Sequence, residues 1–250
     1  EIRLSLVGSE MCIRDRTYVL GEIAERTQMH AYFAPAIDYD GGKYGIGLLT
    51  KQTPIRIQTM ALPGREEARA LIMAEFEDYI YCCTHLSLTE EDRMTSLEMI
   101  KNFAASAKKP FFLAGDMNAE PQSDFIKGLQ KDFQILSNPK VPTFPAPKPE
   151  ETLDYIVTLK NNAKGFAAIS SKVQDEPVAS DHRPLVVTLR TAEKAEKIFR
   201  TKPYLQNPVG NGITVMWETT VPAYCWVEYG TDSTQLQRAR TIMDLSLIHI

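Results

Sequence analysis

The sequence predicts a layered α/β or α+β domain, followed by the first strands of a second, all-β domain. In the first part of the chain, short apolar runs typical of buried strands alternate with segments whose apolar residues recur at helical spacing. Two of the runs are joined by a tight turn, which indicates a hairpin and argues against a barrel of pure βαβ units. Beyond a charged segment, strands of alternating polarity are separated by proline and glycine turns, as in a β-sandwich.

These patterns predict the elements in chain order. We expect a helix over 21–28, strands over 30–37 and 46–51, and a hairpin with strands over 69–76 and 79–86. A helix with acidic residues in its first turn carries apolar residues at Met94, Leu97, Ile100 and Phe103. The last expected elements are a buried strand over 110–115, a helix over 123–133, a proline-rich loop over 138–152, and strands over 153–159 and 183–190.

Residues 1–16 and 245–250 differ from the rest of the chain. The first segment has no clean strand or helix period and lacks the cleavage site of a signal peptide. One DNA string, read in opposite orientations, can encode both Met11–Asp15 and Leu245–His249. We interpret both segments as sequencing adapter translated at the ends of a short metagenomic insert. We therefore expect both to lie outside the fold and the gene to be cut on both sides.

Composition restricts the classes of function. Hydrophobic residues make up 44% of the chain and charged residues 24%, as in ordinary globular proteins. A net charge of −4 disfavours a generic nucleic-acid surface, which is usually basic. No stretch approaches the roughly 18 apolar residues that a membrane span needs. Cys82 and Cys83 point to opposite faces of a predicted strand, so with Cys225 we expect neither a disulfide framework nor a zinc site.

Two polar residues follow a buried strand in the stretch LAGDMN. Asp116 and Asn118 are two positions apart, so both side chains point to the same side of an extended segment. A carboxylate and an amide in this arrangement can bind a water, a metal ion or a phosphate oxygen. The same pattern is also ordinary turn and helix N-cap chemistry, so it does not establish a site by itself.

Further polar groups lie at other strand boundaries. Asp181 and His182 precede a strand, where the carboxylate could hold a hard cation while the imidazole, which titrates near neutrality, moves a proton. Asp154 begins a strand and could orient an imidazole, and His85 ends an apolar run. Each has a structural alternative when taken singly: a surface pair, a solvated turn carboxylate or a satisfied structural histidine.

The stretches THLSL, LAGDMNAEP, LDYIV and SDHRPLVV together resemble, in order and spacing, the motifs of the endonuclease/exonuclease/phosphatase superfamily of metal-dependent phosphoesterases. The resemblance implies that superfamily's fold over 17–191, an α/β (α+β), four-layer αββα sandwich of two mainly antiparallel sheets flanked by helices. It also implies a phosphate-ester substrate. Nucleic acid stays among the candidate substrates but is not favoured, because the chain is acidic.

The same resemblance implies roles for the polar residues at the strand ends. His182 would contact the scissile phosphate and serve as, or assist, the general base, oriented by Asp154. Asp116 would position the attacking water, and Asn118 would hold phosphate oxygens. His85 would protonate the leaving oxygen or donate a hydrogen bond to the phosphate.

A divalent metal ion, Mg²⁺ or Mn²⁺, is the implied cofactor, and Asp181 would lie at its site. Arg69 could reach a phosphate, with a snorkelling structural arginine as the alternative; Tyr44 could face substrate, although we expect it to serve packing. The family's principal metal ligand, a glutamate after an earlier strand, has no counterpart in the visible chain, where its position would precede Thr17. We therefore expect this chain to be inactive and poorly stable, and its parent protein to be active.

A second resemblance concerns the end of the chain. Residues 192–202 are charged and poor in core residues, which indicates a linker. The stretches YLQNP, VMWET and VEYGTD, within 203–244, resemble the N-terminal fibronectin-like domain of purple acid phosphatases. Proteins with that architecture are often exported, so we lean toward a periplasmic or extracellular location.

The leading hypothesis is thus a Mg²⁺-dependent hydrolase of phosphate esters. The alternative is a non-catalytic binding module on the same fold, and the presence of the whole set of polar residues argues against it. A third interpretation treats the histidines as core residues of an unrelated α/β domain. The sequence leaves the substrate and the oligomeric state open.

Overall fold

The structure is a computed structural model of the whole chain. It describes residues 2–6, 11–14, 17–39, 41–160, 162, 165–191, 199–210, 212–220, 226–230, 237–240 and 247–249. The chain divides into two compact units, residues 1–190 and 191–250. Every residue of the predicted site lies in the first unit.

A six-stranded sheet in the order β10–β11–β9–β8–β7–β6 forms the centre of the first unit. Its strands are β6 (Arg56–Leu62), β7 (Arg69–Glu75), β8 (Ile80–His85), β9 (Phe111–Asp116), β10 (Phe133–Ile135) and β11 (Asp154–Leu159). β8 and β9 pair in parallel, and the other neighbours pair antiparallel. A parallel pair needs a crossover connection, which helix α2 (Glu90–Ala105) supplies.

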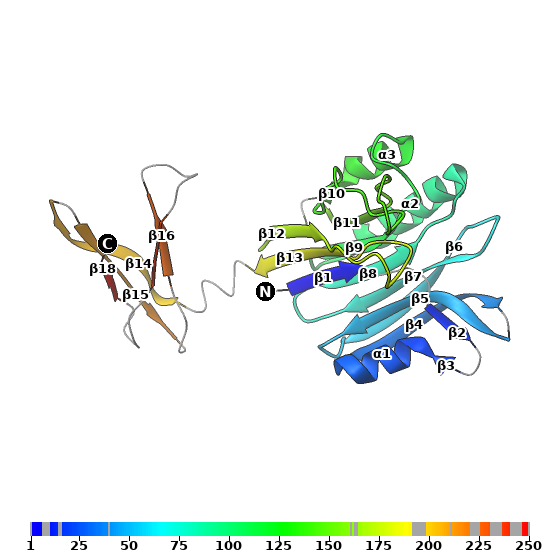
Figure 1. Cartoon of the computed structure of the whole chain (residues 1–250), viewed down its shortest axis with the longest axis horizontal. Helices are drawn as coiled ribbons and strands as arrows, with labels where there is room; N and C mark the ends of the chain where they lie inside the picture. Colours follow the sequence, from blue (N-terminus) through cyan, green and yellow to red (C-terminus); the bar gives the residue numbers. More distant parts are fainter. Residues whose placement is uncertain are drawn as a thin grey trace. The chain divides into compact units, whose positions relative to one another are not determined.

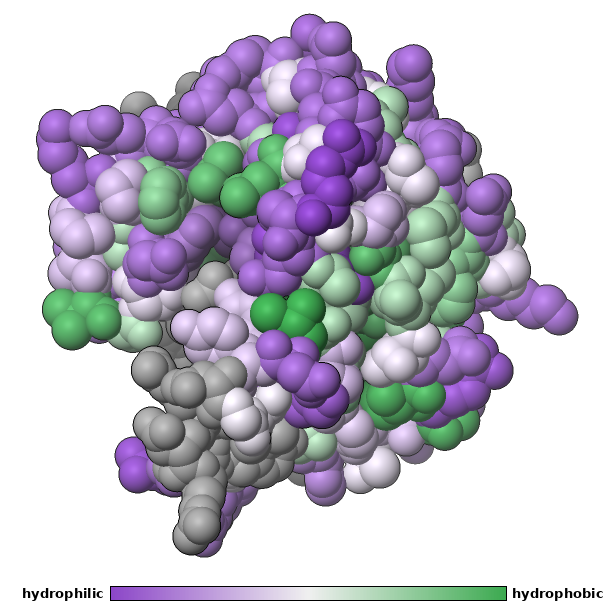
Figure 2. Space-filling model, turned by 90° about the vertical axis from the view of Figure 1, so that its right-hand side faces the viewer, coloured by the Kyte–Doolittle hydropathy of each residue, from purple (hydrophilic) through white to green (hydrophobic). Residues whose placement is uncertain are grey.

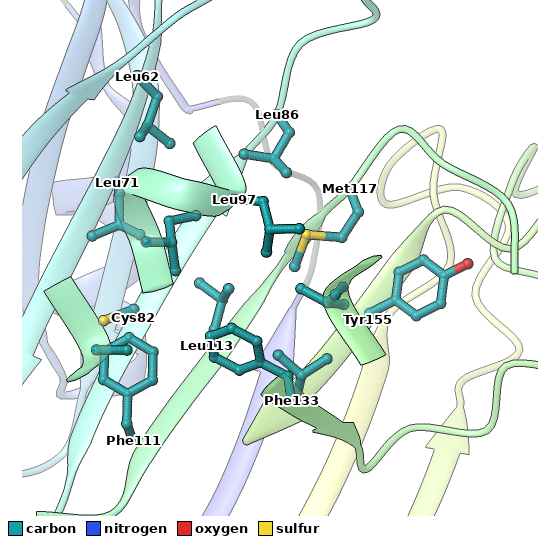
Figure 3. Close-up of a cluster of buried hydrophobic side chains, with 14 of the residues drawn as sticks. Leu62, Leu71, Cys82, Leu86, Leu97, Phe111, Leu113, Met117, Phe133 and Tyr155 are labelled. Atoms are coloured by element: carbon teal, nitrogen blue, oxygen red, sulfur yellow. The ribbon is translucent and has the colours of Figure 1, made fainter. Parts of the chain in front are cut away.

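Both faces of the central strands are buried, because consecutive side chains enter different cores. Leu71 belongs to the helix-side core and Ile72 to the inter-sheet core, and Cys82 and Cys83 divide in the same way. Both cysteines are free, as their opposite directions predict. Helices α2 and α3 (Asp124–Asp132) cover the helix-side core, and Figure 3 shows Leu97 of α2 among its side chains.

The inter-sheet core lies between the central sheet and a second layer of strands. That layer contains the sheets β3–β2–β5–β4 and β1–β13–β12. Its strands are β1 (Ile2–Leu6), β2 (Met11–Arg14), β3 (Thr17–Tyr18), β4 (His30–Tyr39), β5 (Gly42–Thr50), β12 (Phe166–Val173) and β13 (Leu185–Thr191). Helix α1 (Val19–Thr27) contacts this layer, while α2 and α3 lie beyond the central sheet (Figure 1). The first unit is therefore the four-layer αββα sandwich that the resemblance implies.

Residues 2–6, 11–14 and 247–249, which we expected to lie outside the fold, form strands in the structure. β1 pairs with β13 and β2 pairs with β5, both antiparallel. Backbone pairing does not depend on the source of the DNA, so the adapter origin of these residues stays a prediction.

Most other elements form where the sequence predicts them, with shifts at their ends. The helix expected over 21–28 spans Val19–Thr27, and the strand expected over 46–51 spans Gly42–Thr50. The strands β6, β10 and β12 were not predicted from the sequence pattern. β10 is short, and β6 and β12 are largely exposed, so none shows the alternating apolar pattern of a half-buried strand.

The second unit contains only strands among its described residues. β14 (Phe199–Val209), β15 (Gly212–Thr219) and β18 (Leu247–His249) form one sheet, and β16 (Trp226–Tyr229) pairs with β17 (Gln237–Arg240). Val215 and Trp217 are buried in it. β14 begins inside the linker predicted over 192–202, and residues 192–198 of that linker lie outside the described residues. The fibronectin-like assignment stays a prediction.

The surface of the protein is mostly polar on the face drawn in Figure 2, with apolar residues in small separate patches. Scattered apolar residues of this kind are normal on protein surfaces. Within the described parts of the chain, no helix has the length and apolar character needed to cross a membrane.

Candidate active site

Three of the predicted residues lie side by side at one end of the central sheet. His85 ends β8 and pairs in register with Asp116 at the end of β9, which pairs in register with Asp154 at the start of β11. Strand alternation places them on the same face as Cys83 and Ala114, toward the second layer. His85, Asp116 and Asp154 thus form a row, called the site row here, at the end of the inter-sheet space.

A close approach of β8 and β9 fixes one side of the site row. A Cβ atom added at Gly115, directly before Asp116, would lie 2.3 Å from the carbonyl oxygen of Thr84. No side chain fits that distance, so glycine is required where the two strands deliver His85 and Asp116.

A buried tyrosine fixes the other side. Tyr155 follows Asp154 and is fully buried, with its hydroxyl 2.9 Å from the carbonyl oxygen of Ala119 and 3.0 Å from that of Thr152. Figure 3 shows its ring in the helix-side core and its hydroxyl pointing out of that core. The start of β11 is thereby tied to the turn that follows β9.

His182 reaches the site row from the other layer. It lies just before β13, and its Nδ1 is 2.7 Å from Oδ2 of Asp154. The ring of Phe144, in the proline-rich loop, lies against it with a centroid separation of 4.8 Å. Backbone hydrogen bonds join the same loop to Asp181 and Arg183. Asp154 and the loop together set the orientation of the imidazole.

The carboxylate of Asp116 lies between two imidazoles. Its Oδ2 is 3.5 Å from Nε2 of His85 and 3.7 Å from Nε2 of His182. Both distances exceed that of a hydrogen bond, so both nitrogens remain available to a water or a substrate oxygen. Asp116 is only 3% exposed, so the interactions among these groups are weakly screened.

Burial and neighbouring charges separate the pKa values of these groups. Burial, and then the charge of Asp154, raises the pKa of Asp116 to about 7. Burial lowers the pKa of His182, but the hydrogen bond and charge of Asp154 outweigh it and raise that pKa to about 9. Burial, together with the charges of Arg69 and His182, lowers the pKa of His85 to about 3. At neutral pH, His182 is therefore cationic, His85 is neutral, and Asp116 can gain or lose a proton.

Asn118 connects two turns at the site. Its φ of 45° is in the left-handed region, which asparagine tolerates better than most residues. Its backbone N–H donates to Oδ1 of Asp116 at 2.8 Å, and its Nδ2 donates to the carbonyl oxygen of Leu86 at 2.9 Å. The amide carries a second N–H, which can serve a substrate oxygen.

Arg69 begins β7 and is 7% exposed. Its terminal nitrogens lie 3.5 Å from Glu66 and 3.4 Å from Glu67, and its buried Nε has no hydrogen-bond partner. Arg69, His85 and Tyr44 line a small recess beside the site row. The structure therefore brings Arg69 next to His85, as a phosphate contact would require.

Asp181 is exposed, unlike the site row, and its Oδ1 accepts a hydrogen bond of 3.2 Å from Oγ of Ser180. Among the residues that the structure describes, no group of three or more His, Cys, Asp or Glu side chains could hold a metal ion. The described residues therefore do not form a complete site for the implied metal, and Asp181 is a single candidate ligand.

Sequence reasoning missed two residues that shape the site, Phe144 and Glu66. Phe144 packs on His182, and Glu66 is hydrogen-bonded to the loop after His85. Neither belongs to a periodic segment, and both act through contacts that are remote in sequence. No signal in the local pattern could have identified them.

The sequence model of the Endonuclease/Exonuclease/phosphatase family matches residues 9–182, which is more than half of the chain and includes the site row and His182. The chain belongs to this family. Enzymes of the family typically depend on a divalent metal ion. A comparison with curated protein sequences finds no match.

Solved structures share the fold. A mannosyl-6-phosphatase from Bacteroides thetaiotaomicron has a TM-score of 0.57 at 13% identity, covering 68% of this chain and 80% of its own. The human Nocturnin catalytic domain with bound sulfate has a TM-score of 0.53 at 19% identity, covering 69% and 76%. D. rerio TDP2 complexed with a single-strand DNA product has a TM-score of 0.57 at 14% identity, covering 76% and 86%. At these identities the likeness shows the fold alone.

Proposed function

We propose that the protein hydrolyses phosphate esters, and that the site row together with His182 is its active site. The observation that carries the proposal is the position of Asp116. Its carboxylate, with a pKa raised to about 7, lies between a cationic and a neutral imidazole in a buried site. Family membership supports phosphate-ester chemistry in general.

The side chains have separate tasks in this proposal. His182, held by Asp154, contacts an oxygen of the scissile phosphate through Nε2 and assists catalysis as a cation. Asp116 orients the attacking water and accepts its proton, because a base is most effective when its pKa lies near the working pH. His85 is neutral at pH 7, which favours a hydrogen-bond donor to the phosphate over an acid that protonates the leaving oxygen.

Two further residues would contact phosphate oxygens. Asn118 would use the amide N–H that is not engaged by Leu86, and Arg69 would use its guanidinium in the recess that it lines with His85. Both contacts are hydrogen bonds to an anion, which are stronger than those between neutral groups.

The proposed cofactor is Mg²⁺ or Mn²⁺, with Asp181 as one ligand. A bound cation would neutralise charge on the phosphate and polarise its oxygens. The charge balance supports a cation, since Asp116, Asp154 and Asp181 act on the imidazolium of His182, while the guanidinium of Arg69 is paired with Glu66 and Glu67. Because the metal site is incomplete among the described residues, the steps above are assigned to side chains alone. For the same reason, we propose that this chain has little or no activity, and that a form with a further acidic ligand is active.

The substrate class within phosphate esters is a separate part of the proposal. A net charge of −4 favours small phosphate esters or lipid head groups over nucleic acid. The similar structures include both a sugar phosphatase and a complex with DNA, so they do not distinguish between these classes. We further propose that the second unit is a fibronectin-like domain of the purple acid phosphatase type and that the protein is exported.

Hydrolysis of p-nitrophenyl phosphate and bis(p-nitrophenyl) phosphate in Mg²⁺ tests the proposal. This chain, and a form extended at its N-terminus to supply the further acidic ligand, are each compared with their own His182→Ala variant. We expect the extended form to be active and to lose roughly 10²–10⁴ in rate in the variant. Equal rates for the extended form and its variant would refute the catalytic assignment, and robust turnover by this chain would refute its proposed inactivity. Phosphate binding without turnover by either form would favour the binding module.

A further inference from the structure

The loop after His85 is held by one carboxylate from a different part of the chain. Glu66 lies in the connection between β6 and β7. Its Oε2 accepts hydrogen bonds from Oγ of Ser87 at 2.9 Å and from Oγ1 of Thr89 at 3.3 Å. Its Oε1 accepts a hydrogen bond of 2.7 Å from the backbone N–H of Leu88. Three consecutive residues of the loop thus share one acceptor group.

Hydrogen bonds and a neighbouring charge stabilise the ionised carboxylate of Glu66. Burial raises the pKa of Glu66, but hydrogen bonds from Ser87 and Leu88 and the charge of Arg69 outweigh it and lower the pKa to about 2. Ser87 is fully buried, and its Oγ also accepts a hydrogen bond from the Thr89 N–H at 2.9 Å. A shift of the loop away from Glu66 would leave the buried hydroxyl of Ser87 without this acceptor, which is costly.

His85 lies directly before this loop, and the residue between them is also fixed. The backbone N–H of Leu86 donates to the carbonyl oxygen of Asp116 at 3.0 Å, and its carbonyl accepts from the Asn118 side chain at 2.9 Å. The chain after His85 is therefore held by the turn after β9 on one side and by Glu66 on the other. Because a side chain follows its backbone, these contacts determine where the imidazole lies relative to Asp116.

The same carboxylate faces Arg69, whose Nη2 lies 3.5 Å from Oε1 of Glu66. Arg69 lines the recess beside His85, so Glu66 contacts both the loop after the imidazole and the cation next to it. Glu66 is itself placed by its neighbour Arg65. The backbone and guanidinium nitrogens of Arg65 bind Asp92, in the first turn of α2, at 2.8 to 3.1 Å.

We propose that Glu66 is a positioning residue that fixes the imidazole of His85 and the guanidinium of Arg69 relative to Asp116. The expected effect of Glu66 on phosphate binding rests on the proposed function, whereas its effect on the position of the His85 imidazole does not. Glu66 acts through these neighbours and is not assigned a contact with the substrate.

Two substitutions and a matched control test this role. Glu66→Ala removes the acceptor, and Glu66→Gln keeps the size and one acceptor oxygen while removing the charge. Glu91→Gln is the control, because Glu91 is exposed and reaches Arg65 of the same connection at 3.9 Å. For each protein, the imidazole NMR signals of His85 are recorded well below the Tm, with the signals of His30 as an internal reference. The Kd for inorganic phosphate is measured in Mg²⁺.

Glu66→Ala should shift or double the His85 signals, leave the His30 signals unchanged, and weaken phosphate binding about fivefold or more. Glu66→Gln should give an intermediate result, and Glu91→Gln should match the wild type. A lower Tm with unchanged His85 signals and unchanged Kd would overturn the proposal, because only stability would then depend on Glu66. If Glu66→Ala does not fold, Glu66→Gln supplies the same comparison. If the His85 signals respond but the wild type binds no phosphate, the proposed function fails and the positioning role stands.

Discussion

Oδ2 of Asp154 lies 2.7 Å from Nδ1 of His182, and this pair joins the two layers of the sandwich at the candidate site. Asp154 begins a strand of the central sheet, and His182 precedes a strand of the second layer. Because both side chains are largely buried, their interaction sets the charge that Nε2 of His182 presents to Asp116. The protonation state of the site therefore depends on the packing of one layer against the other.

Asp154→Asn keeps the shape of this pair and removes its negative charge. The pKa of His182 should fall from about 9 toward its ordinary value, since the hydrogen bond and charge of Asp154 raise it. At pH 8 the imidazolium would be mostly lost, and phosphate affinity should fall about tenfold. NMR titration of the imidazole measures the pKa, and calorimetry measures the affinity. A pKa that stays near 9 in the variant would show that Asp154 is not the cause.

Asp116→Asn should change phosphate affinity and turnover in opposite directions. Removing a negative charge beside the phosphate should strengthen phosphate binding, by about threefold or more. Turnover of the extended form should fall by roughly 10²–10⁴, because the variant has no base to accept the proton of the water. Asp124→Asn, at an exposed position in the first turn of α3, is the control for loss of a carboxylate. Parallel losses of binding and turnover in Asp116→Asn would instead indicate a disturbed structure.

At position 118, the glycine variant should be more stable than the alanine variant, which is the reverse of the usual order. Both variants lose the hydrogen bond to Leu86, which costs about 1 kcal/mol. Alanine also incurs about 1 kcal/mol for a positive φ, whereas glycine adopts that conformation freely. Asn118→Ala should therefore be less stable than Asn118→Gly in urea unfolding. If Asn118→Ala is the more stable variant, the left-handed conformation is not present in solution.

Glu66 should make stability depend on acid pH. Its folded pKa of about 2 lies below its ordinary 4.5, so its contribution is fully present above pH 4.5 and is lost as the pH falls through 2. Between pH 6 and pH 3, the wild type should lose on the order of 2 kcal/mol more unfolding free energy than Glu66→Gln. Urea unfolding at each pH measures the difference. Equal losses in the two proteins would mean that the hydrogen bonds of Glu66 do not form.

The members of the site row could be predicted from the sequence, but their geometry could not. His85 and Asp116 each end a buried apolar run, and Asp154 begins one, so each interrupts a pattern that is read locally. Their contact depends on the order β8–β9–β11, with one parallel and one antiparallel pair. Strand order is set by packing over the whole domain, which the local pattern does not contain.

Other features could not be predicted from the sequence, for different reasons. The strands β6 and β12 are mostly exposed, so burial leaves no alternating pattern in them. Glu66 and Phe144 lie in irregular segments and act on partners far away in the chain. Asp181 was predicted beside His182, but only the structure shows that its side chain is exposed while the imidazole is buried.

The claim that His85, Asp116, Asp154 and His182 form one phosphate site is tested most directly by titrating inorganic phosphate into the protein in Mg²⁺. The imidazole NMR signals of His85 and His182 report binding, and those of His30 serve as the reference. We predict that both site imidazoles respond with one common Kd, that His30 does not respond, and that His182→Ala weakens binding about tenfold or more. No saturable response, or separate Kd values for the two imidazoles, would contradict the account.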